Sequence, residues 1–462
     1  MHPTVTFDAG LLRRYDVSGP RYTSYPTALQ FHEGFGIDDY IQAASRSNQA
    51  SQPLSLYVHI PFCTSPCFYC GCTRIITRDP LKGKLYLERL YREIGLQAEL
   101  FAPDRVVDQL HFGGGTPTFL GIDDMAVLMH RLDSGFNLLR DETREYSIEI
   151  DPRTVTGDSV AQLAALGFNR LSFGVQDFDL RVQETVNRKQ SVEQTFDAID
   201  AARRAGIRSI NLDLIYGLPF QNVEGFSRTL DTVISVRPER LAVYGYAHLP
   251  RVFKAQRQIR DDTLPSAATK LQLLDLAIGK LTDAGYVYIG MDHFALPEDE
   301  LVVAQYEGHL HRNFQGYSTR ADCDVVGLGM SSIGKIADTY SQNSKDIASY
   351  YAALDSGRLA IARGVTLSPD DRLRRGVIQK IMCQGMLDFR ELGFRDQADF
   401  LQCFESAAPR LQMLETDGLI EIDTARLAVT PAGRLLLRVV AMSFDAYLPQ
   451  TADGDQRHSR VV

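Results

Sequence analysis

Short apolar segments alternate with longer amphipathic stretches between residues 54 and 291. Six apolar segments have the length of a buried strand: residues 56–60, 109–112, 146–150, 170–175, 210–215 and 241–246. Amphipathic stretches long enough for crossover helices lie between or after them, at residues 86–100, 160–166, 192–205 and 266–284. This alternation of strand and helix predicts a parallel sheet with helices outside it.

Glycine and proline turns follow several of these strands, at Gly113, at residues 217–219 and at residues 249–250. In α/β folds the loops after the carboxyl ends of the strands carry the functional site, so we expect the site at this edge. Six strand-helix units suit an incomplete TIM-like (βα)6 barrel. We expect this barrel and its closing elements to span residues 51–365.

The pattern differs on either side of the predicted barrel. Residues 1–50 are rich in Tyr, Pro and Gly, with one helical stretch at 38–46, and predict an arm rather than a domain. After residue 294 the alternation fades into a Gly-rich run that ends near Gly334, which we interpret as structure closing over the site. Residues 366–462 predict a small, mostly helical C-terminal domain, with helices at 370–386, 397–414 and 434–447 and a hairpin at 418–429.

Composition excludes several classes of protein. The chain has 49 basic and 58 acidic residues and a net charge of −9, which argues against a general nucleic-acid binder. A polyanionic small molecule would need a local group of Arg and Lys inside a pocket. No apolar run reaches the roughly 18 residues of a membrane span, and the first residues lack the pattern of a secretory signal. We therefore expect a soluble cytoplasmic protein with reduced thiols.

Four of the seven cysteines lie within residues 63–72. Cys63, Cys67 and Cys70 have C-x3-C-x2-C spacing, which suits three thiolates around an iron-sulfur cubane and leaves one iron open. Zinc sites usually join two separated ligand pairs, so a zinc knuckle is the weaker alternative. Cys72 projects from the same side of an extended loop as Cys70, but a spacing of about 6.6 Å is wide for one small ion. We expect the remaining cysteines to be buried, inert thiols: Cys323, Cys383 and Cys403.

The cysteine spacing, with Tyr69 directly before the third cysteine, resembles that of the radical S-adenosylmethionine (SAM) superfamily. Cys72, the segment PRYTSYPT at residues 20–27 and the segment FGGGTPT at residues 112–118 narrow the resemblance to its oxygen-independent coproporphyrinogen III oxidase family. The resemblance covers nearly the whole chain. It implies that Cys72 is the family's extra cysteine and not a cluster ligand.

The resemblance implies one [4Fe-4S] cluster on Cys63, Cys67 and Cys70 and two SAM molecules. The implied SAM contacts are Tyr57, Tyr69, Gly114, Gly115, Thr116, Glu149, Gln176, Arg188, Asp213, Ala247 and Ile333. Taken singly, each residue also has a structural interpretation. The glycines also suit a tight turn, and Glu149 also suits an ion pair, because an unpaired charge in an apolar strand is costly to bury. Glu149 and Arg21 are candidate substrate-side groups, with Arg21 pairing a substrate carboxylate.

The implied function is the anaerobic oxidative decarboxylation of two propionates of coproporphyrinogen III to vinyl groups, giving protoporphyrinogen IX, through a 5′-deoxyadenosyl radical. The resemblance further implies that the N-terminal arm closes over the substrate. It also implies that a low-potential donor such as flavodoxin or ferredoxin supplies electrons and that the enzyme is a monomer. A haem-binding chaperone of the same superfamily is one alternative, although such chaperones lack Cys72 and the 20–27 segment by resemblance. A zinc-stabilised binding protein is the other, and metal analysis separates it.

Overall fold

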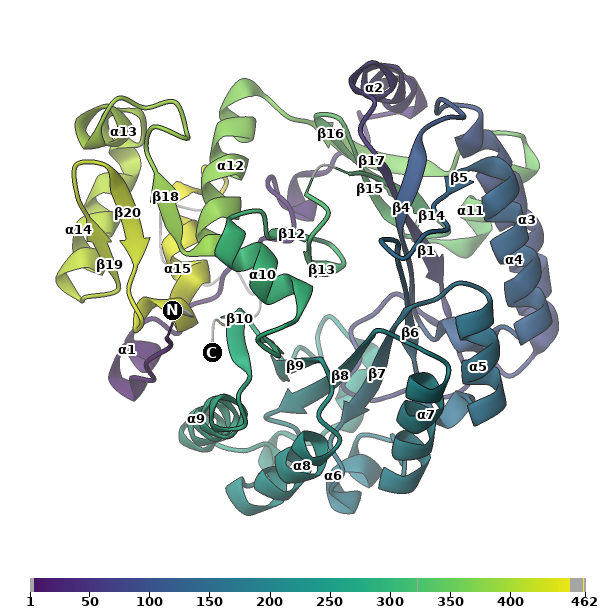
Figure 1. Cartoon of the computed structure of the whole chain (residues 1–462), viewed down its shortest axis with the longest axis horizontal. Helices are drawn as coiled ribbons and strands as arrows, with labels where there is room; N and C mark the ends of the chain where they lie inside the picture. The colour runs from purple at the N-terminus through teal and green to yellow at the C-terminus, as the bar shows by residue number, and fades with distance from the viewer. Residues whose placement is uncertain (1–3, 322, 449–459, 461–462) are drawn as a thin grey trace.

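The computed structural model describes residues 4–321, 323–448 and 460. A curved sheet wrapped by helices forms its centre (Figure 1). All six predicted strands are present and adjacent, and each pairs with its neighbour in parallel. Because the sheet order of the described residues is open at both ends, the predicted incomplete barrel is confirmed. In sheet order the six are β9 (Arg240–Gly245), β8 (Ser209–Tyr216), β7 (Arg170–Gln176), β6 (Glu145–Ile150), β4 (Val106–Gly114) and β1 (Leu54–Ile60).

Helices cover the outer face of these strands (Figure 1). Alternate residues of β1, such as Leu56, Val58 and Ile60, are completely buried in the main core. The helix predicted at residues 86–100 begins earlier, because the Asp79 carboxylate accepts the Leu81 N–H and Pro80 suits the first helical position. The outer helices are α3 (Pro80–Ala98), α4 (Ile122–Gly135), α5 (Gly157–Ala165), α6 (Leu180–Thr185), α7 (Val192–Arg204), α8 (Val223–Ser235) and α9 (Ala267–Asp283).

The sheet continues beyond both edges of the barrel. Next to β1 lies β14 (Asp324–Leu328), which is parallel to it and is followed by three antiparallel strands. The sequence predicted only closing structure here, and these pairings were missed. The additional elements are β15 (Ile333–Ile336), β16 (Thr339–Asn343), β17 (Ile361–Thr366), α11 (Ile347–Asp355), β5 (Asn137–Leu138), β10 (Val287–Gly290), β11 (His293–Ala295), α10 (Glu300–Glu307) and the hairpin β12 (His311–Asn313) with β13 (Gly316–Ser318).

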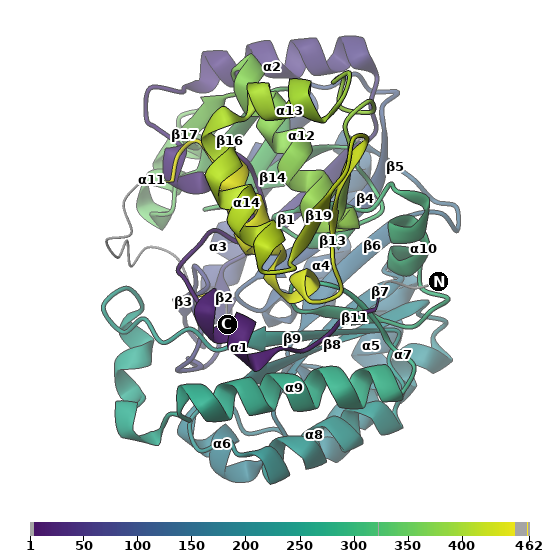
Figure 2. The ribbon, with the colours of Figure 1, turned by 90° about the vertical axis from the view of Figure 1, so that its left-hand side faces the viewer.

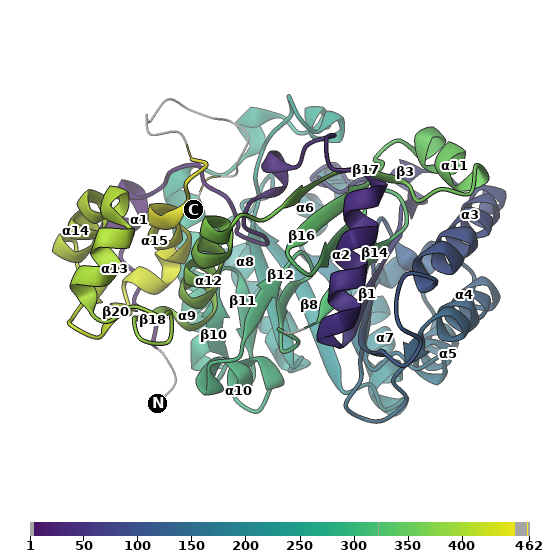
Figure 3. The same ribbon diagram turned by 90° about the horizontal axis from the view of Figure 1, so that it is seen from above.

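The two ends of the chain pack together beside the barrel (Figures 2 and 3). Tyr22 and Tyr25 of the arm are buried in the core of the C-terminal helices, and Tyr22 donates a hydrogen bond to Asp445 at 2.9 Å. A 3-10 turn at Glu405–Ala407 breaks the helix predicted at residues 397–414. The elements are α1 (Ala9–Arg14), α2 (Ile37–Ala50), α12 (Pro369–Gln384), α13 (Gln397–Cys403), α14 (Ala408–Thr416), α15 (Leu437–Ala441), β18 (Met386–Asp388), β19 (Ile420–Ile422) and β20 (Arg426–Val429).

The boundaries 1–50, 51–365 and 366–462 stay a prediction, and residues 1–3, 322, 449–459 and 461–462 within them lie outside the described residues. Among the helices that the structure describes, none combines the length and the apolar character that a membrane span requires.

A buried glutamate, Glu93 of α3, connects the barrel to the added strands. Its carboxylate accepts hydrogen bonds from the Gly329 N–H at 2.7 Å, the Tyr350 hydroxyl at 2.7 Å and the Asn343 side chain at 2.5 Å. Complete burial raises the pKa of Glu93 from 4.5 to about 7, although these three donors oppose the rise.

We expect Glu93 to make the protein less stable as the pH rises from 4.5 to 7. In this window the unfolded chain releases the Glu93 proton while the folded chain retains it, so stability that is fully present below pH 4.5 is lost towards pH 7. The loss is roughly 3 kcal/mol. Urea unfolding across this range should show a flatter pH dependence for Glu93→Gln than for the wild type. Glu88→Gln, at an exposed position of the same helix, is the control, and equal slopes for all three proteins would contradict the assignment.

Candidate active site

The cysteine loop begins at β2 (Phe62–Cys63), directly after β1, and returns at β3 (Ile75–Ile76), which pairs with β2 in parallel. Arg74 lies inside the loop and donates hydrogen bonds to three of its carbonyls, those of Cys67 at 3.3 Å, Cys70 at 3.1 Å and Cys72 at 3.3 Å. One guanidinium group therefore organises the segment that carries the predicted ligands.

The first two predicted cluster ligands accept hydrogen bonds from outside the loop. The Thr116 hydroxyl lies 3.5 Å from the Cys63 sulfur, and guanidinium nitrogens of Arg188 and Arg153 lie 3.4 Å and 3.8 Å from the Cys67 sulfur. Two guanidinium groups from outside the loop therefore face the Cys67 sulfur. Burial raises the pKa of Cys63 to about 11, which the Thr116 hydrogen bond opposes.

Cys70 and Cys72 interact with each other. The Cys72 N–H donates to the Cys70 sulfur at 3.4 Å, and the Cys72 thiol also donates to it. The thiol hydrogen bond lowers the pKa of Cys70 to about 6 and raises that of Cys72 well above its usual value. Cys72 therefore contacts a predicted ligand, as its two-residue spacing allows.

The loop fits a [4Fe-4S] cluster in its donor set: three thiols on one segment, with hydrogen-bond donors around them. No three His, Cys, Asp or Glu side chains within the described ranges gather as ligands of one metal ion. A cubane does not require such convergence, because its thiolates bind different irons.

The glycine turn after β4 packs directly on the cysteine loop. The Gly115 N–H donates to the Ile60 carbonyl and the Thr116 N–H to the Phe62 carbonyl, both at 2.8 Å. A Cβ atom at Gly115 would lie 2.7 Å from the Phe62 oxygen, and Gly114 has a φ of 118° with its missing Cβ facing His59. Both glycines are thus required for close backbone packing, which supports the tight-turn interpretation of this segment.

Glu149 lies on β6 and faces the hollow of the barrel, with 46% of its side chain exposed. The argument that its charge is costly because it is buried is therefore wrong: side chains alternate along the strand, and Glu149 is on the open face. Its carboxylate accepts the Gly114 N–H at 3.3 Å and lies 3.3 Å from Nε2 of His111. Tyr57 stacks on the same histidine, with ring centroids 5.8 Å apart. Two candidates, Tyr57 of β1 and Glu149 of β6, thus meet at His111 of β4, a residue that sequence reasoning missed.

Arg188 joins the cysteine loop to the neighbouring strand ends. Its Nη1 lies 3.1 Å from the Asp151 carboxylate, and its Nη2 donates to the Gly174 carbonyl at 2.6 Å. Arg153 also pairs with Asp151, at 2.6 Å. Burial would raise the pKa of Asp151, but the two guanidinium groups hold it below its usual value. Asp151 and Arg153 were missed as site residues, although the sequence Asp-Pro-Arg directly after a strand was a usable signal.

Gln176 of β7 and Asp213 of β8 are the last members of a row of candidate residues that crosses neighbouring strands. We call this set the strand-end row; it comprises Tyr57, Gly114, Gly115, Thr116, Glu149, Gln176, Arg188 and Asp213. Asp213 accepts hydrogen bonds from Ser172 at 3.0 Å and Asn211 at 2.9 Å. Burial, with a further contribution from the charge of Glu149, raises the pKa of Asp213 to about 6. Gln176 has a φ of 69°, so the strand ends there in a left-handed turn.

Three predicted contacts lie outside this row. The backbone carbonyls of Tyr69 and Ala247 both accept hydrogen bonds from Gln256, at 2.9 Å and 3.2 Å, so these two residues lie close together. Ile333 is on β15, beyond the other edge of the barrel, where it packs with Phe31 and Tyr340. Gly327 of β14 is the register partner of Tyr57, and a Cβ atom on it would lie 2.9 Å from the Ile333 carbonyl carbon, so Ile333 is two strands away from Tyr57.

Arg21 of the arm reaches the barrel, where its guanidinium group pairs with Asp292 and lies 5.7 Å from the centre of the Tyr244 ring. About a third of the Arg21 side chain, 35%, remains exposed. The arm thus places a cation at the barrel, but this cation already has a carboxylate partner.

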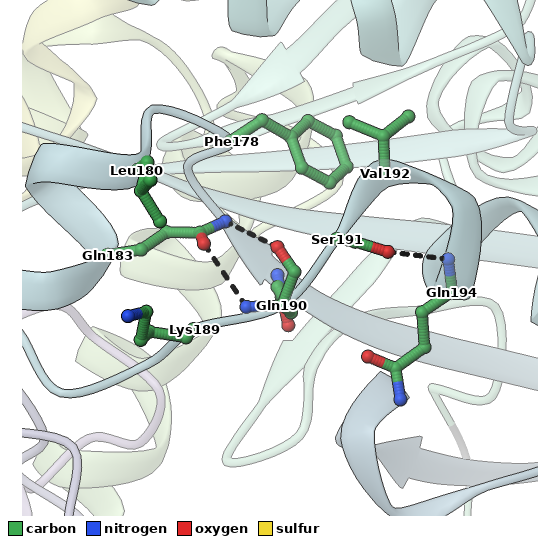
Figure 4. A pocket seen from close by; sticks show the side chains of 8 residues that line it. All are labelled: Phe178, Leu180, Gln183, Lys189, Gln190, Ser191, Val192 and Gln194. Atoms are coloured by element: carbon green, nitrogen blue, oxygen red, sulfur yellow. Dashed lines mark hydrogen bonds between the residues drawn. The ribbon is translucent and has the colours of Figure 1, made fainter.

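Two further features lie away from the row. A surface pocket of about 420 Å³ is formed between α6 and α7, where Gln183 and Gln190 hydrogen-bond each other (Figure 4). It contains none of the predicted site residues. Cys323 and Cys383 are buried, as predicted, whereas Cys403 is exposed near the end of the short helix α13, and the prediction for it was wrong.

Comparisons with known proteins agree with this arrangement. Residues 57–233 match the radical SAM superfamily model, and residues 367–436 match the HemN C-terminal domain model. The chain is 52% identical over 462 residues to the oxygen-independent coproporphyrinogen III oxidase of Pseudomonas aeruginosa, covering 100% of both chains. It is 48% identical over 458 residues to the Escherichia coli enzyme of that name, covering 99% of both.

A solved structure described as "Coproporphyrinogen III oxidase (HemN) from Escherichia coli is a Radical SAM enzyme" has a TM-score of 0.91 and 46% identity, and the alignment covers 96% of this chain and 100% of that one. Full-length identity of this order, together with the matched barrel and C-terminal models, assigns the family. The chain belongs to the oxygen-independent coproporphyrinogen III oxidases of the radical SAM superfamily.

Proposed function

We propose that this chain catalyses the anaerobic oxidative decarboxylation of two propionate side chains of coproporphyrinogen III, giving the vinyl groups of protoporphyrinogen IX. The relatives carry the name of this activity over their full length. The observation that carries the proposal is the position of Arg188, which contacts both Cys67 and the backbone of β7. Arg188 thereby joins the cysteine loop to the strand-end row, so a cofactor that contacts both would lie at the carboxyl edge of the barrel strands.

The superfamily implies a [4Fe-4S] cluster and SAM. Cys63, Cys67 and Cys70 would hold the cluster. When bound, the cluster and SAM together supply one-electron chemistry that generates a radical able to abstract hydrogen from unactivated carbon. Residues of the strand-end row would hold the amino, carboxylate and ribose groups of SAM: Tyr57, Gly114, Gly115, Thr116, Glu149, Gln176, Arg188 and Asp213.

Each side chain in the row has a role that follows from its contacts. Arg188, a buried guanidinium with nitrogens on two different partners, suits a carboxylate of fixed orientation. Glu149 is open to the barrel and accepts hydrogen bonds, which suits an ammonium group. Tyr69 and Ala247, held by Gln256, would lie against the adenine. We propose that the site holds two SAM molecules, and Ile333 on β15 would contribute an apolar packing contact.

We also propose the electron donor, the location, the oligomeric state and the domain organisation of the enzyme. A low-potential carrier such as flavodoxin or ferredoxin would supply electrons in the cytoplasm to a monomeric enzyme. The arm of residues 1–50 would cover the substrate, residues 51–365 would form the catalytic barrel, and residues 366–462 would form the C-terminal domain. The match of residues 367–436 to a separate family model supports the last boundary.

We expect Arg21→Ala to raise the KM for coproporphyrinogen III about 10-fold or more, because one charge-assisted carboxylate contact contributes roughly 1.5–3 kcal/mol. SAM cleavage without substrate should not change, since Arg21 contacts Asp292 and Tyr244 rather than the strand-end row. Steady-state kinetics and 5′-deoxyadenosine formation measure the two effects. Arg14→Ala, which removes an exposed arginine of the same arm, is the control, and an unchanged KM in Arg21→Ala would remove Arg21 from the substrate site.

The experiment that tests the function is anaerobic reconstitution with iron and sulfide, followed by a strong reductant, SAM and coproporphyrinogen III. We expect carbon dioxide, protoporphyrinogen IX and 5′-deoxyadenosine to form together. Formation of 5′-deoxyadenosine without decarboxylation would refute coproporphyrinogen III as the substrate and would favour the haem-binding chaperone alternative. Co-purifying zinc, with neither product, would refute the cluster.

A further inference from the structure

An exposed apolar and basic surface lies directly beside the cysteine loop. It consists of the exposed residues of β3 and the first turns of α3, which form one continuous segment of the chain. Ile76, Leu81 and Leu85 have exposed fractions of 43%, 62% and 47%. Three exposed cations are interspersed with them: Arg78 in the segment between β3 and α3, and Lys82 and Lys84 in the first turns of α3. We call these six side chains the β3–α3 surface.

This surface is connected to a predicted cluster ligand through the backbone. Ile76 is the register partner of Cys63 in the β2–β3 pair, and the Thr77 N–H donates to the Cys63 carbonyl at 2.9 Å. The strand that carries the exposed Ile76 is therefore hydrogen-bonded to the strand that carries Cys63 (Figure 2). A partner seated on Ile76 would be separated from Cys63 by a single strand spacing, about 5 Å.

The charge of the β3–α3 surface is opposite to that of the whole chain, which is −9. Among the described residues, neither Arg78 nor either lysine has a carboxylate within ion-pair distance. The one acidic residue between Ile76 and Leu85 is Asp79, whose carboxylate accepts the Leu81 N–H at the start of α3. The surface thus combines unpaired positive charge with an apolar centre, which matches an acidic protein partner.

We propose that the β3–α3 surface is the docking site of an acidic one-electron carrier protein. This inference rests on the proposed function, because it requires a cluster at Cys63. One electron passes from the reduced carrier to the oxidised cluster, so the carrier is oxidised by one electron and the cluster is reduced by one. No bond forms or breaks. The cations orient the carrier as it approaches, and the exposed apolar side chains hold it over the strand that pairs with Cys63.

The test compares two charge-reversal variants of the reconstituted enzyme. The first carries Arg78→Glu, Lys82→Glu and Lys84→Glu. The matched control carries Arg46→Glu, Arg204→Glu and Arg390→Glu, which changes the net charge equally at exposed cations of α2, α7 and the loop after β18. Purified reduced flavodoxin is the carrier probe, and a neutral photoreduced deazaflavin is the small-molecule reductant, because a neutral reductant does not respond to surface charge.

We expect the first variant to lose at least about 10-fold in the rate of cluster reduction by flavodoxin at low ionic strength, with the difference shrinking at high salt. Flavodoxin affinity, measured by titration, should fall in parallel. Reduction by deazaflavin should match that of the wild type. Leu81→Ser, a single exposed substitution, should weaken flavodoxin binding without changing its salt dependence, which provides a second measurement if the triple variant folds poorly.

Three outcomes would overturn the docking site. Wild-type flavodoxin rates in the first variant would do so, as would an equal loss in the control variant. An increased KM for coproporphyrinogen III with unchanged flavodoxin rates would instead assign the positive charge to substrate attraction. Failure of the proposed function is distinguishable, because the wild-type enzyme reduced by deazaflavin would then release no carbon dioxide from coproporphyrinogen III.

Discussion

Replacing Cys67 with alanine is expected to yield a folded protein that retains little iron and cleaves no measurable SAM. Cys67 supplies one of three proposed thiolates, and its sulfur is the one that faces two guanidinium groups, those of Arg188 and Arg153. With only two thiolates left, two irons of the cubane would lack a protein ligand instead of one, and the cluster would not be held. Iron and sulfide content after anaerobic reconstitution, the charge-transfer absorption of the cluster and 5′-deoxyadenosine formation measure the loss.

Two other cysteines serve as controls for this substitution. Cys403→Ala removes an exposed thiol outside the loop and should leave iron content and SAM cleavage unchanged. Cys72→Ala removes the thiol that donates to Cys70. The protein should still assemble a cluster, because the three proposed ligands Cys63, Cys67 and Cys70 remain. A Cys67→Ala protein with wild-type iron content and SAM cleavage would refute the ligand assignment. Loss of iron in Cys72→Ala alone would make Cys72 the ligand instead.

The barrel could be predicted because buried apolar residues recur along its strands and amphipathic helices lie between them. In β8, Ile210, Leu212 and Leu214 are completely buried and alternate with the partly exposed Asn211 and Asp213. The added strands could not be found in this way. All five residues of β16 are buried, yet they read Thr-Tyr-Ser-Gln-Asn, and Asn343 among them finds its partner on α3, at Glu93. Neither apolar runs nor alternation marks such a strand.

The site was predicted in part, and for different reasons at different residues. Their positions on neighbouring parallel strands placed Glu149, Gln176 and Asp213 in one region, with Glu149 and Gln176 near the carboxyl ends of β6 and β7 and Asp213 inside β8. Burial could not be judged from the same pattern, and the structure shows that Glu149 is about half exposed, with 46% of its side chain accessible. No pattern in the sequence points to Ile333, which entered through the family resemblance only.

Contacts between distant segments were beyond sequence reasoning. Arg21 and Asp292 pair across most of the chain, and His111 gathers Tyr57 and Glu149 from neighbouring strands. Such pairs depend on the curvature of the sheet and on the packing of the arm, which local propensity does not encode. The Arg21–Asp292 pair shows that the arm contacts the barrel even though the two are far apart in sequence.

Replacing Arg188 with alanine is expected to cause the other large loss, in both stability and SAM binding. Arg188 is buried, and its removal leaves the Asp151 carboxylate with Arg153 alone and the Gly174 carbonyl without this donor. Breaking a buried ion pair from one side typically costs about 3–5 kcal/mol, and the remaining Arg153 contact should keep the cost near the lower end. We expect a lower thermal unfolding temperature and at least about 100-fold weaker SAM binding to the reconstituted enzyme.

The variant Arg188→Lys separates charge from geometry. A lysine restores the positive charge beside Asp151, so most of the stability should return, but one ammonium group cannot contact Asp151, Cys67 and the Gly174 carbonyl as two guanidinium nitrogens do. SAM affinity should therefore stay low while the unfolding temperature recovers. Lys189→Ala, which removes the neighbouring exposed lysine, should change neither quantity. SAM binding at the wild-type level in Arg188→Lys would show that only the positive charge is needed at this position. The proposed link between the cysteine loop and the strand-end row would then depend on charge and not on the direction of the hydrogen bonds.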